Sequence, residues 1–279
     1  MKHVRPNCVE GQFYPENEKE LVNLIERKLK EELEKIDLTQ ASNPIIGGVV
    51  PHAGHVYCAT EAVHFFEIVR YSKQIYDVVI LINPSHRGSA LPVSIDDHEF
   101  WASPLGQIRI DRELAIETGL PLDRIAQATE HSGEVVVPFI QYFMGNDIPL
   151  LPVNFSAQNN ENARMLAGVL YEACQKLKRK PLIIASSDFN HFSSPIEGER
   201  LDDIALQALL AHDFDGFEKR IKEYNISICG FGAILALMHY AKLKCGSFDI
   251  DILRRGHSGE VFPSNQVVDY ISMLVYKNY

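Results

Sequence analysis

The sequence predicts an α/β fold in which a central mixed, mostly parallel β-sheet is flanked by helices. Short apolar segments alternate along the chain with longer segments of helical periodicity, as in folds whose parallel strands are joined by helices. The segment at residues 77–83 (DVVILIN) is apolar almost throughout and rich in β-branched residues, which is typical of a strand buried on both faces. No internal repeat or linker interrupts the 279 residues, so residues 1–279 are predicted to form a single domain.

The expected helices are recognised by apolar residues that recur on one face. In the first helix, at residues 16–36, Leu21 and Ile25 lie on the same face. The helix at residues 135–143 follows an EHSGE segment, and Ser132 is expected to be its N-cap. The other helices are expected at residues 60–71, 111–118, 159–176, 200–211, 214–223 and 231–242.

The expected strands are short apolar segments at residues 45–50, 77–83, 148–154, 181–185 and 266–276. Residues 100–110 are expected to form a hairpin at an edge of the sheet. Because the strands of a hairpin are antiparallel, the sheet is expected to be mixed rather than purely parallel.

Composition excludes several classes of function. The chain has 37 acidic and 27 basic residues and a net charge of −10, whereas a non-specific nucleic-acid binder needs the opposite sign. The first residues lack the apolar region of a signal peptide, and no apolar segment approaches the ~20 residues that span a bilayer. A cytoplasmic protein without nucleic-acid or membrane partners is therefore expected. The five cysteines include no C-x-x-C pair, which argues against a disulfide framework or a zinc ribbon.

Three of the expected strands are each followed at once by a loop that contains histidine. These loops read PHAGH, PSHRG and SSDFNHF, and they carry His52, His86 and His191. In open α/β sheets, ligands bind in the crevice beyond the carboxyl ends of the strands. If the three strands are parallel, the three imidazoles are delivered to one edge of the sheet. One such histidine is usually a turn or surface residue, but three together indicate a site.

A cysteine and a fourth histidine are further candidates. Cys229 lies just before the helix expected from residue 231, and a helix N-terminus lowers the pKa of a thiol and favours the thiolate. The alternative is a buried structural cysteine. His131 lies in the EHSGE segment, where helix capping explains its neighbours but not the histidine itself.

At these motifs the sequence resembles the Memo family. The resemblance runs in order through PHAGHVYCA, NPSHRG, EHSGEVVVPF, SSDFNHF and ICGFG, and with the opening GQFYP it spans residues 11–232. Memo-like proteins have the fold of class III extradiol ring-cleavage dioxygenases. Those enzymes hold non-haem Fe(II) with two histidines and a carboxylate, and in Memo-like proteins a cysteine stands at the carboxylate position.

The resemblance implies that His52, His86 and Cys229 are metal ligands. It places His191, preceded by Asp188, where the dioxygenases keep an acid/base histidine, so these two residues are the catalytic candidates. Imidazole and thiolate together suit iron, copper or zinc. One ion is expected, Fe(II) or copper in preference to zinc.

Two loops depart from the family pattern. Family loops often read GPSHH and PHAGY, whereas NPSHRG and PHAGH introduce Arg87 and His55 here. Together with His131, these are the candidates for substrate binding. Arg87 could attract an anionic ligand, and the alternative is an ordinary surface charge. The candidates for orienting the second nitrogen of the ligand histidines are Asp188, Glu130 and Glu134.

Three hypotheses of function follow. The first is a metal-dependent oxidoreductase resembling non-haem dioxygenases, with His191 moving a proton. The second is a non-catalytic protein that binds a small molecule or a peptide in the same crevice, by analogy with the signalling role of animal Memo proteins. The third is a hydrolase with Cys229 as nucleophile and His191 as base. A homo-oligomer is compatible with each of them.

Overall fold

The computed structural model describes residues 3–278 and contains an eight-stranded sheet at its centre. Seven of the strands lie in the order β10-β11-β2-β8-β3-β7-β4, and β9 pairs with β11 beside them. Their bounds are β2 (Ile45–Val50), β3 (Val78–Pro84), β4 (Val93–Ile95), β7 (Leu150–Phe155), β8 (Pro181–Ser186), β9 (His191–Ser193), β10 (Phe248–His257) and β11 (Val267–Lys277). The five strands predicted from the sequence are among them, within two residues at each end.

The centre of this sheet is parallel and its margins are antiparallel. Strands β2, β8, β3 and β7 run in the same direction, whereas β11, β10 and β4 run against their neighbours. The predicted mixed α/β fold is therefore confirmed. Val50 lies opposite Ser186, and Ile82 lies opposite Ala185, so β2, β3 and β8 end at nearly the same level. The loops that follow these strands consequently emerge at one edge of the sheet.

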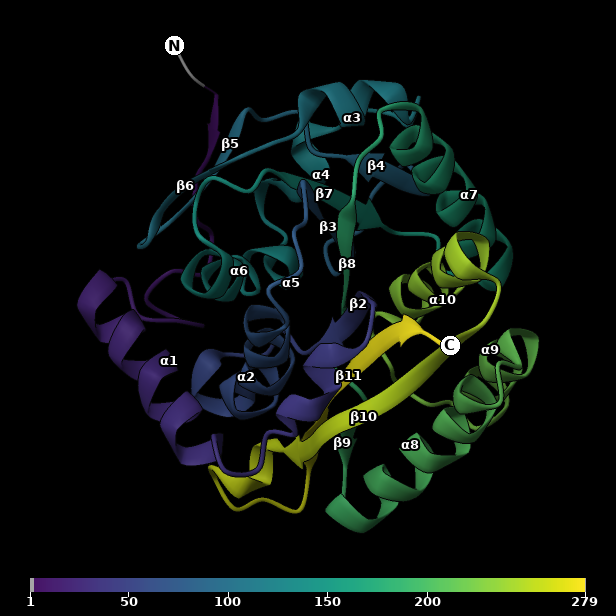
Figure 1. The fold of residues 1–279 in the computed structure, drawn as a ribbon. Helices are drawn as coiled ribbons and strands as arrows, with labels where there is room; N and C mark the ends of the chain where they lie inside the picture. The colour runs from purple at the N-terminus through teal and green to yellow at the C-terminus, as the bar shows by residue number, and fades with distance from the viewer. Residues whose placement is uncertain (1–2, 279) are drawn as a thin grey trace.

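Helices cover both faces of the sheet (Figure 1). One face is covered by α1 (Glu18–Glu32), α2 (His55–Ser72) and α6 (Val137–Met144), and the other by α7 (Asn160–Lys176), α8 (Pro195–Leu210), α9 (Phe214–Glu223) and α10 (Phe231–Cys245). Residues 78–82 of β3 are all apolar because both faces of the strand are covered: Val79 and Leu81 pack against the layer of α1, α2 and α6, and Ile80 and Ile82 pack against the layer of α7 to α10. No helix within residues 3–278 is long and apolar enough to cross a membrane.

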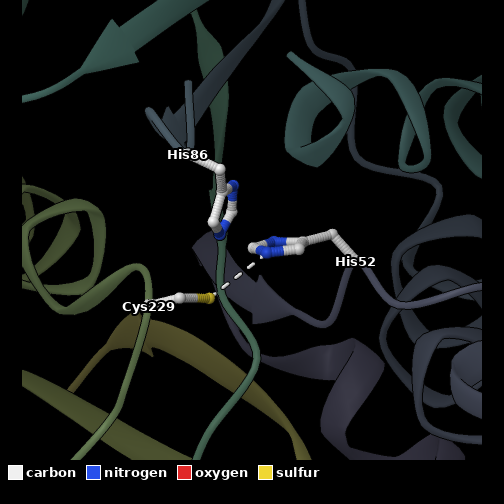
Figure 2. A group of neighbouring side chains, drawn as sticks. All are labelled: His52, His86 and Cys229. Carbon is white, nitrogen blue, oxygen red and sulfur yellow. Dashed lines mark hydrogen bonds between the residues drawn. The ribbon is translucent and has the colours of Figure 1, made fainter. Parts of the chain in front are cut away.

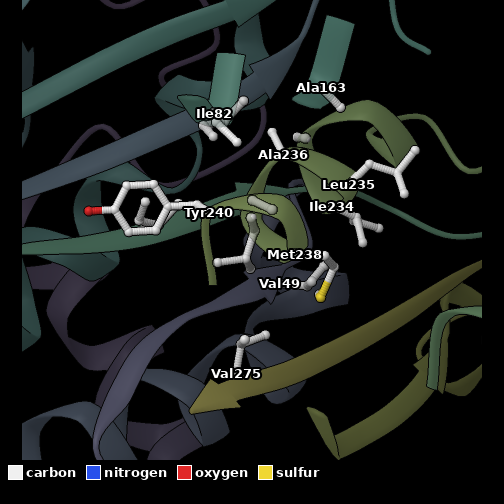
Figure 3. Close-up of a cluster of buried hydrophobic side chains, with 14 of the residues drawn as sticks. Val49, Ile82, Ala163, Ile234, Leu235, Ala236, Met238, Tyr240 and Val275 are labelled. Carbon is white, nitrogen blue, oxygen red and sulfur yellow. The ribbon is translucent and has the colours of Figure 1, made fainter. Parts of the chain in front are cut away.

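The second layer is centred on α10. Figure 3 shows Ile234, Leu235 and Met238 of this helix among side chains of β2, β3 and β11. All three are completely buried. Residues 232–238 of α10 are all buried, as is typical of a helix in such a central position. Since Cys229 precedes α10, this packing fixes its position relative to the strands.

The hairpin predicted at residues 100–110 forms, but it does not extend the central sheet. Strands β5 (Phe100–Ser103) and β6 (Gly106–Arg109) build a separate three-stranded sheet with β1 (Val4–Arg5), which pairs in parallel with β5. The edge of the central sheet is β4 instead. The remaining short elements are η1 (Leu38–Ser42), α3 (Arg112–Glu117), α4 (Arg124–Ala128), α5 (His131–Glu134) and η2 (Ser258–Glu260).

Several boundaries differ from the predicted ones for local reasons. Helix α2 begins at His55 rather than at residue 60, and the His55 backbone N–H donates to the carbonyl of Phe13 at 2.7 Å. Helix α8 begins at Pro195 rather than at residue 200, because Ser194 caps it and proline suits the first helical position. The predicted capping by Ser132 is wrong. Glu130 caps the short helix α5 and accepts from the Ser132 N–H, and the predicted helix at residues 135–143 begins at Val137.

Candidate metal centre

Three of the predicted residues converge at the edge where β2 and β3 end. His52 and His86 come from the loops after these strands, and Cys229 comes from the segment before α10 (Figure 2). His52 Nε2 lies 3.2 Å from Cys229 Sγ, and one donor atom from each of the three side chains lies within 4.8 Å of the others. Nitrogen and sulfur ligands about 2.0–2.3 Å from one ion lie about 3–4.5 Å apart. The cluster therefore has the size and the donor set of a three-ligand metal site.

Hydrogen bonds leave one nitrogen of each ligand imidazole available. Ser186 Oγ donates to the carbonyl of Ser132 at 2.7 Å, so this hydroxyl accepts from Nδ1 of His52, also at 2.7 Å. The Nε2 atom of His52 is then the unprotonated nitrogen, and it faces the cysteine. His86 Nδ1 lies 2.9 Å from Glu130 Oε1, and its backbone N–H donates to Oε2 of the same carboxylate. Such partners orient ligand histidines in metal sites.

Electrostatics favours a neutral imidazole at His52 and an ionised carboxylate at Glu130. Burial lowers the pKa of His52 well below its usual range, and the neighbouring imidazoles act in the same direction. Burial alone would raise the pKa of Glu130, but its bonds with His86 and Ser132 outweigh that effect and lower the pKa to about 2. Glu130 therefore stays ionised beside His86, which is the state that an orienting partner requires.

The pKa of the Cys229 thiol is shifted in the direction opposite to the predicted one. Burial, together with the charge of Asp188, raises the pKa of Cys229 well above its usual value, because desolvation disfavours the thiolate. This increase in the pKa outweighs the decrease that was expected from the helix N-terminus. A metal ion would have to displace the thiol proton, since thiolate is the ligating form.

His131 lies beside the three candidate ligands. Its ring centroid is 4.7 Å from that of His86 and 5.7 Å from that of His52. His86, Glu130 and His131 also have donor atoms within 4.8 Å of one another. In this second group, however, the carboxylate already faces Nδ1 of both imidazoles, at 2.9 and 3.4 Å. Glu130 therefore serves better as a shared orienting partner than as a ligand.

A cavity of about 550 Å³ opens beside the cluster, within the usual size range of small-molecule sites. Its polar wall contains His52, His86, His131, Asp188 and His191, and its aromatic wall contains Phe13, Tyr57, Phe192, Phe262 and Tyr270. The structure thus brings both catalytic candidates and His131 together with two of the candidate ligands. The aromatic residues were not predicted, because they lie in separate loops, strands and a helix with no common motif.

The two catalytic candidates are held by backbone groups. Asp188 Oδ1 accepts from the backbone N–H of His52 at 2.7 Å. Burial raises the pKa of Asp188 to about 6. His191 Nδ1 donates to the carbonyl of Ser227 at 2.7 Å, which leaves Nε2 as the proton-accepting nitrogen of this ring.

Two of the predicted substrate-binding residues, His55 and Arg87, do not line the cavity. His55 begins α2 and is completely buried, with Nε2 2.8 Å from the carbonyl of Val135 and its ring 4.3 Å from that of Phe139. Burial lowers the pKa of His55 to about 4, so it is a neutral residue of the core and not of the cavity wall. Arg87 is exposed and outside the wall. Glu134 also lies apart, because it accepts hydrogen bonds from Arg5 and from other N-terminal residues.

Replacing Glu130 with glutamine is expected to weaken metal binding by about 10–100-fold, the usual cost of losing an orienting partner. Glutamine keeps the size of the side chain but loses the charge that faces His86. Competition with a chromophoric chelator measures the effect. Glu117→Gln, which removes an exposed pair with Lys176, is the control and should bind as the wild type does. Equal affinity for the Glu130→Gln variant would show that this carboxylate does not support the ligand.

Comparison with known proteins identifies the family of this chain. A family model described as Memo-like protein matches residues 5–274. A MEMO1 family protein of Pyrobaculum aerophilum is 34% identical over 98% of this chain and 99% of its own length. Similar proteins of Methanococcoides burtonii and Thermoplasma volcanium are 33% and 35% identical, over 98% and 97% of this chain and 100% and 98% of their own lengths. The chain therefore belongs to the Memo family.

Proposed function

We propose that this protein is a metal-dependent oxidoreductase that acts on a small molecule in the cavity beside His52, His86 and Cys229. The observation that supports this most is the position of the three candidate ligands. Their donor atoms cluster next to a cavity that is also lined by the acid/base candidates Asp188 and His191 and by aromatic residues. A bound iron or copper ion would supply redox chemistry and open positions for ligands.

The residues of the chain support acid/base chemistry at this place. His191 Nε2 can accept a proton from a substrate hydroxyl, because Nδ1 is held by the Ser227 carbonyl. Asp188, with a pKa of about 6, changes protonation near neutral pH and can hold or return a proton. The aromatic residues of the wall offer apolar surface to a substrate. The hydrolase is not favoured, because the pKa of the Cys229 thiol is raised.

Oxygen uptake tests the proposal directly. Protein loaded anaerobically with Fe(II) is mixed with oxygen and a panel of catechols, and uptake is compared with that of its variants. His191→Gln should keep the metal and lose about 10²–10⁴-fold in turnover, the range for a general acid or base. His239→Gln is the matched control, because this histidine contacts Asn160 outside the cavity.

The outcomes separate the three hypotheses. Metal binding without uptake across the panel would contradict catalysis on this class and favour a binding protein that uses the same cavity. A Cys229→Ala variant that keeps its metal but loses activity would favour the nucleophile instead. Loss of both metal and activity in that variant supports the ligand role.

A further inference from the structure

Phe192 has an unusual backbone conformation for a phenylalanine in a strand. Its φ is 61°, in the left-handed region. Within residues 3–278, four other non-glycine residues have such a φ, and each lies within two residues of the end of a helix: Lys73, Lys178, His212 and Asn225. A left-handed residue is a common way to end a helix. Phe192 lies inside β9, so helix termination does not explain its conformation.

The conformation arises from a bulge in the pairing of β9 with β11. His191 lies opposite Val268 and Ser193 lies opposite Val267, so Phe192 is an additional residue between two consecutive pairs. In a common type of bulge this additional residue is a left-handed glycine. A side chain at such a position is strained, because its Cβ approaches the following carbonyl oxygen.

Burial in the core does not compensate for this strain. The Phe192 residue is 70% exposed. Its ring forms part of the wall of the cavity, as do Phe262, which is 62% exposed, and the catalytic candidate His191. The Phe192 and His191 ring centroids are 5.8 Å apart. The folded protein thus carries both a strained backbone and an exposed aromatic ring at the cavity, and a glycine would remove both.

We infer that Phe192 is a specificity-determining residue whose bulge directs its ring onto the apolar face of the ligand. Bulges next to functional sites often redirect a side chain, and backbone strain persists at sites where it serves function. Phe13, Tyr57 and Tyr270 supply further aromatic surface in the same wall, so the preferred ligand has a flat apolar face. The inference rests on the proposed function insofar as the cavity is taken as the ligand site.

The test combines two measurements on Phe192→Gly. Calorimetric titration with 2-naphthol and with its saturated analogue decahydro-2-naphthol compares a flat ring system with a puckered one on the same carbon skeleton. The wild type should bind 2-naphthol more tightly, and the variant should lose about tenfold in affinity for it, which corresponds to about 1.4 kcal/mol. At the same time the variant's Tm should rise by about 2–4 °C, because the strain is relieved.

Two variants serve as controls. Lys178→Gly makes the same backbone change at an exposed helix end, so it should raise Tm without changing the affinity for 2-naphthol. Phe192→Tyr keeps a ring and should keep the affinity. Unchanged affinity in Phe192→Gly, a lowered Tm, or a wild type that does not bind 2-naphthol would each overturn the inference.

Failure of the proposed function and failure of the inference about Phe192 give different experimental results. Metal content should be the same in the wild type and in Phe192→Gly, because Phe192 is not among the groups that could hold an ion. If the wild type binds no metal, the oxidoreductase proposal fails while the comparison of the two naphthols still decides the role of Phe192. If metal binds and the affinity for 2-naphthol is unchanged by the substitution, only the inference about Phe192 fails.

Discussion

Replacing Cys229 with alanine is expected to weaken binding of Fe(II) or Cu(II) by more than about 100-fold. The variant removes one of three donors and leaves His52 and His86 as the remaining pair. Losing a partner that only orients a ligand already costs about 10–100-fold, so losing a ligand should cost more. Chelator competition measures the affinity. Cys245→Ala is the control, because this cysteine contacts Ala241 near the far end of α10 and its loss should leave affinity unchanged.

The metal affinity of the same site should depend on pH. Because burial raises the pKa of the Cys229 thiol, the thiol is protonated at neutral pH without metal, and binding must release that proton. Affinity of the wild type should therefore rise with pH, by up to about tenfold per unit for one released proton. The alanine variant should lose this slope. An equal slope in the two proteins would mean that Cys229 is not a ligand.

Replacing Arg5 with methionine is expected to destabilise the fold by about 3–5 kcal/mol, the usual cost of leaving one charge of a buried pair without its partner. Arg5 is completely buried, and its Nη1 lies 2.7 Å from Glu134 Oε2. Its other nitrogens donate to the carbonyls of Gln127 and Glu130, each at 2.7 Å, and the guanidinium lies over the Trp101 ring at 4.4 Å. Loss of Arg5 therefore leaves the buried Glu134 carboxylate without its cation and removes one donor from each of the two carbonyls.

Urea denaturation measures this loss. Arg200→Met is the matched control, because its pair with Glu197 is about half exposed on both sides, and such pairs contribute about 0–1 kcal/mol. A double variant, Arg5→Met with Glu134→Gln, should recover part of the stability, since the orphaned charge is gone. If Arg5→Met costs no more than the control, the N-terminal segment does not anchor the α5 region that carries Glu130.

The sequence predicts well the strands that are covered by helices on both faces, because most residues of such strands are apolar. Strand β10 was not predicted, although Phe248, Ile250 and Ile252 alternate with Asp249 and Asp251 in the way that a half-exposed strand does. That pattern was available and would have identified the strand. The separate sheet of β1, β5 and β6 could not be foreseen, since β1 has only two residues and its partner is about a hundred positions away.

The histidines of the candidate site could be predicted because strand ends share an edge, but the residues that they contact lie far away in the sequence. Cys229 lies 177 positions from His52 in the sequence, and only the family resemblance identifies it as a metal ligand. Arg5 lies 129 positions from Glu134, and a single arginine near the N-terminus carries no such signal. His55 was misplaced because α2 starts at that residue, and the first helical turn directs its ring into the core.

Anomalous diffraction from crystals of protein loaded with Fe(II) or copper tests the central claim most directly. The claim is that His52, His86 and Cys229 hold one metal ion together. It predicts one anomalous peak about 2.0–2.3 Å from Nε2 of His52, Nε2 of His86 and Sγ of Cys229. A peak within the His86, Glu130 and His131 group instead, or no peak in this cavity after loading, would contradict it.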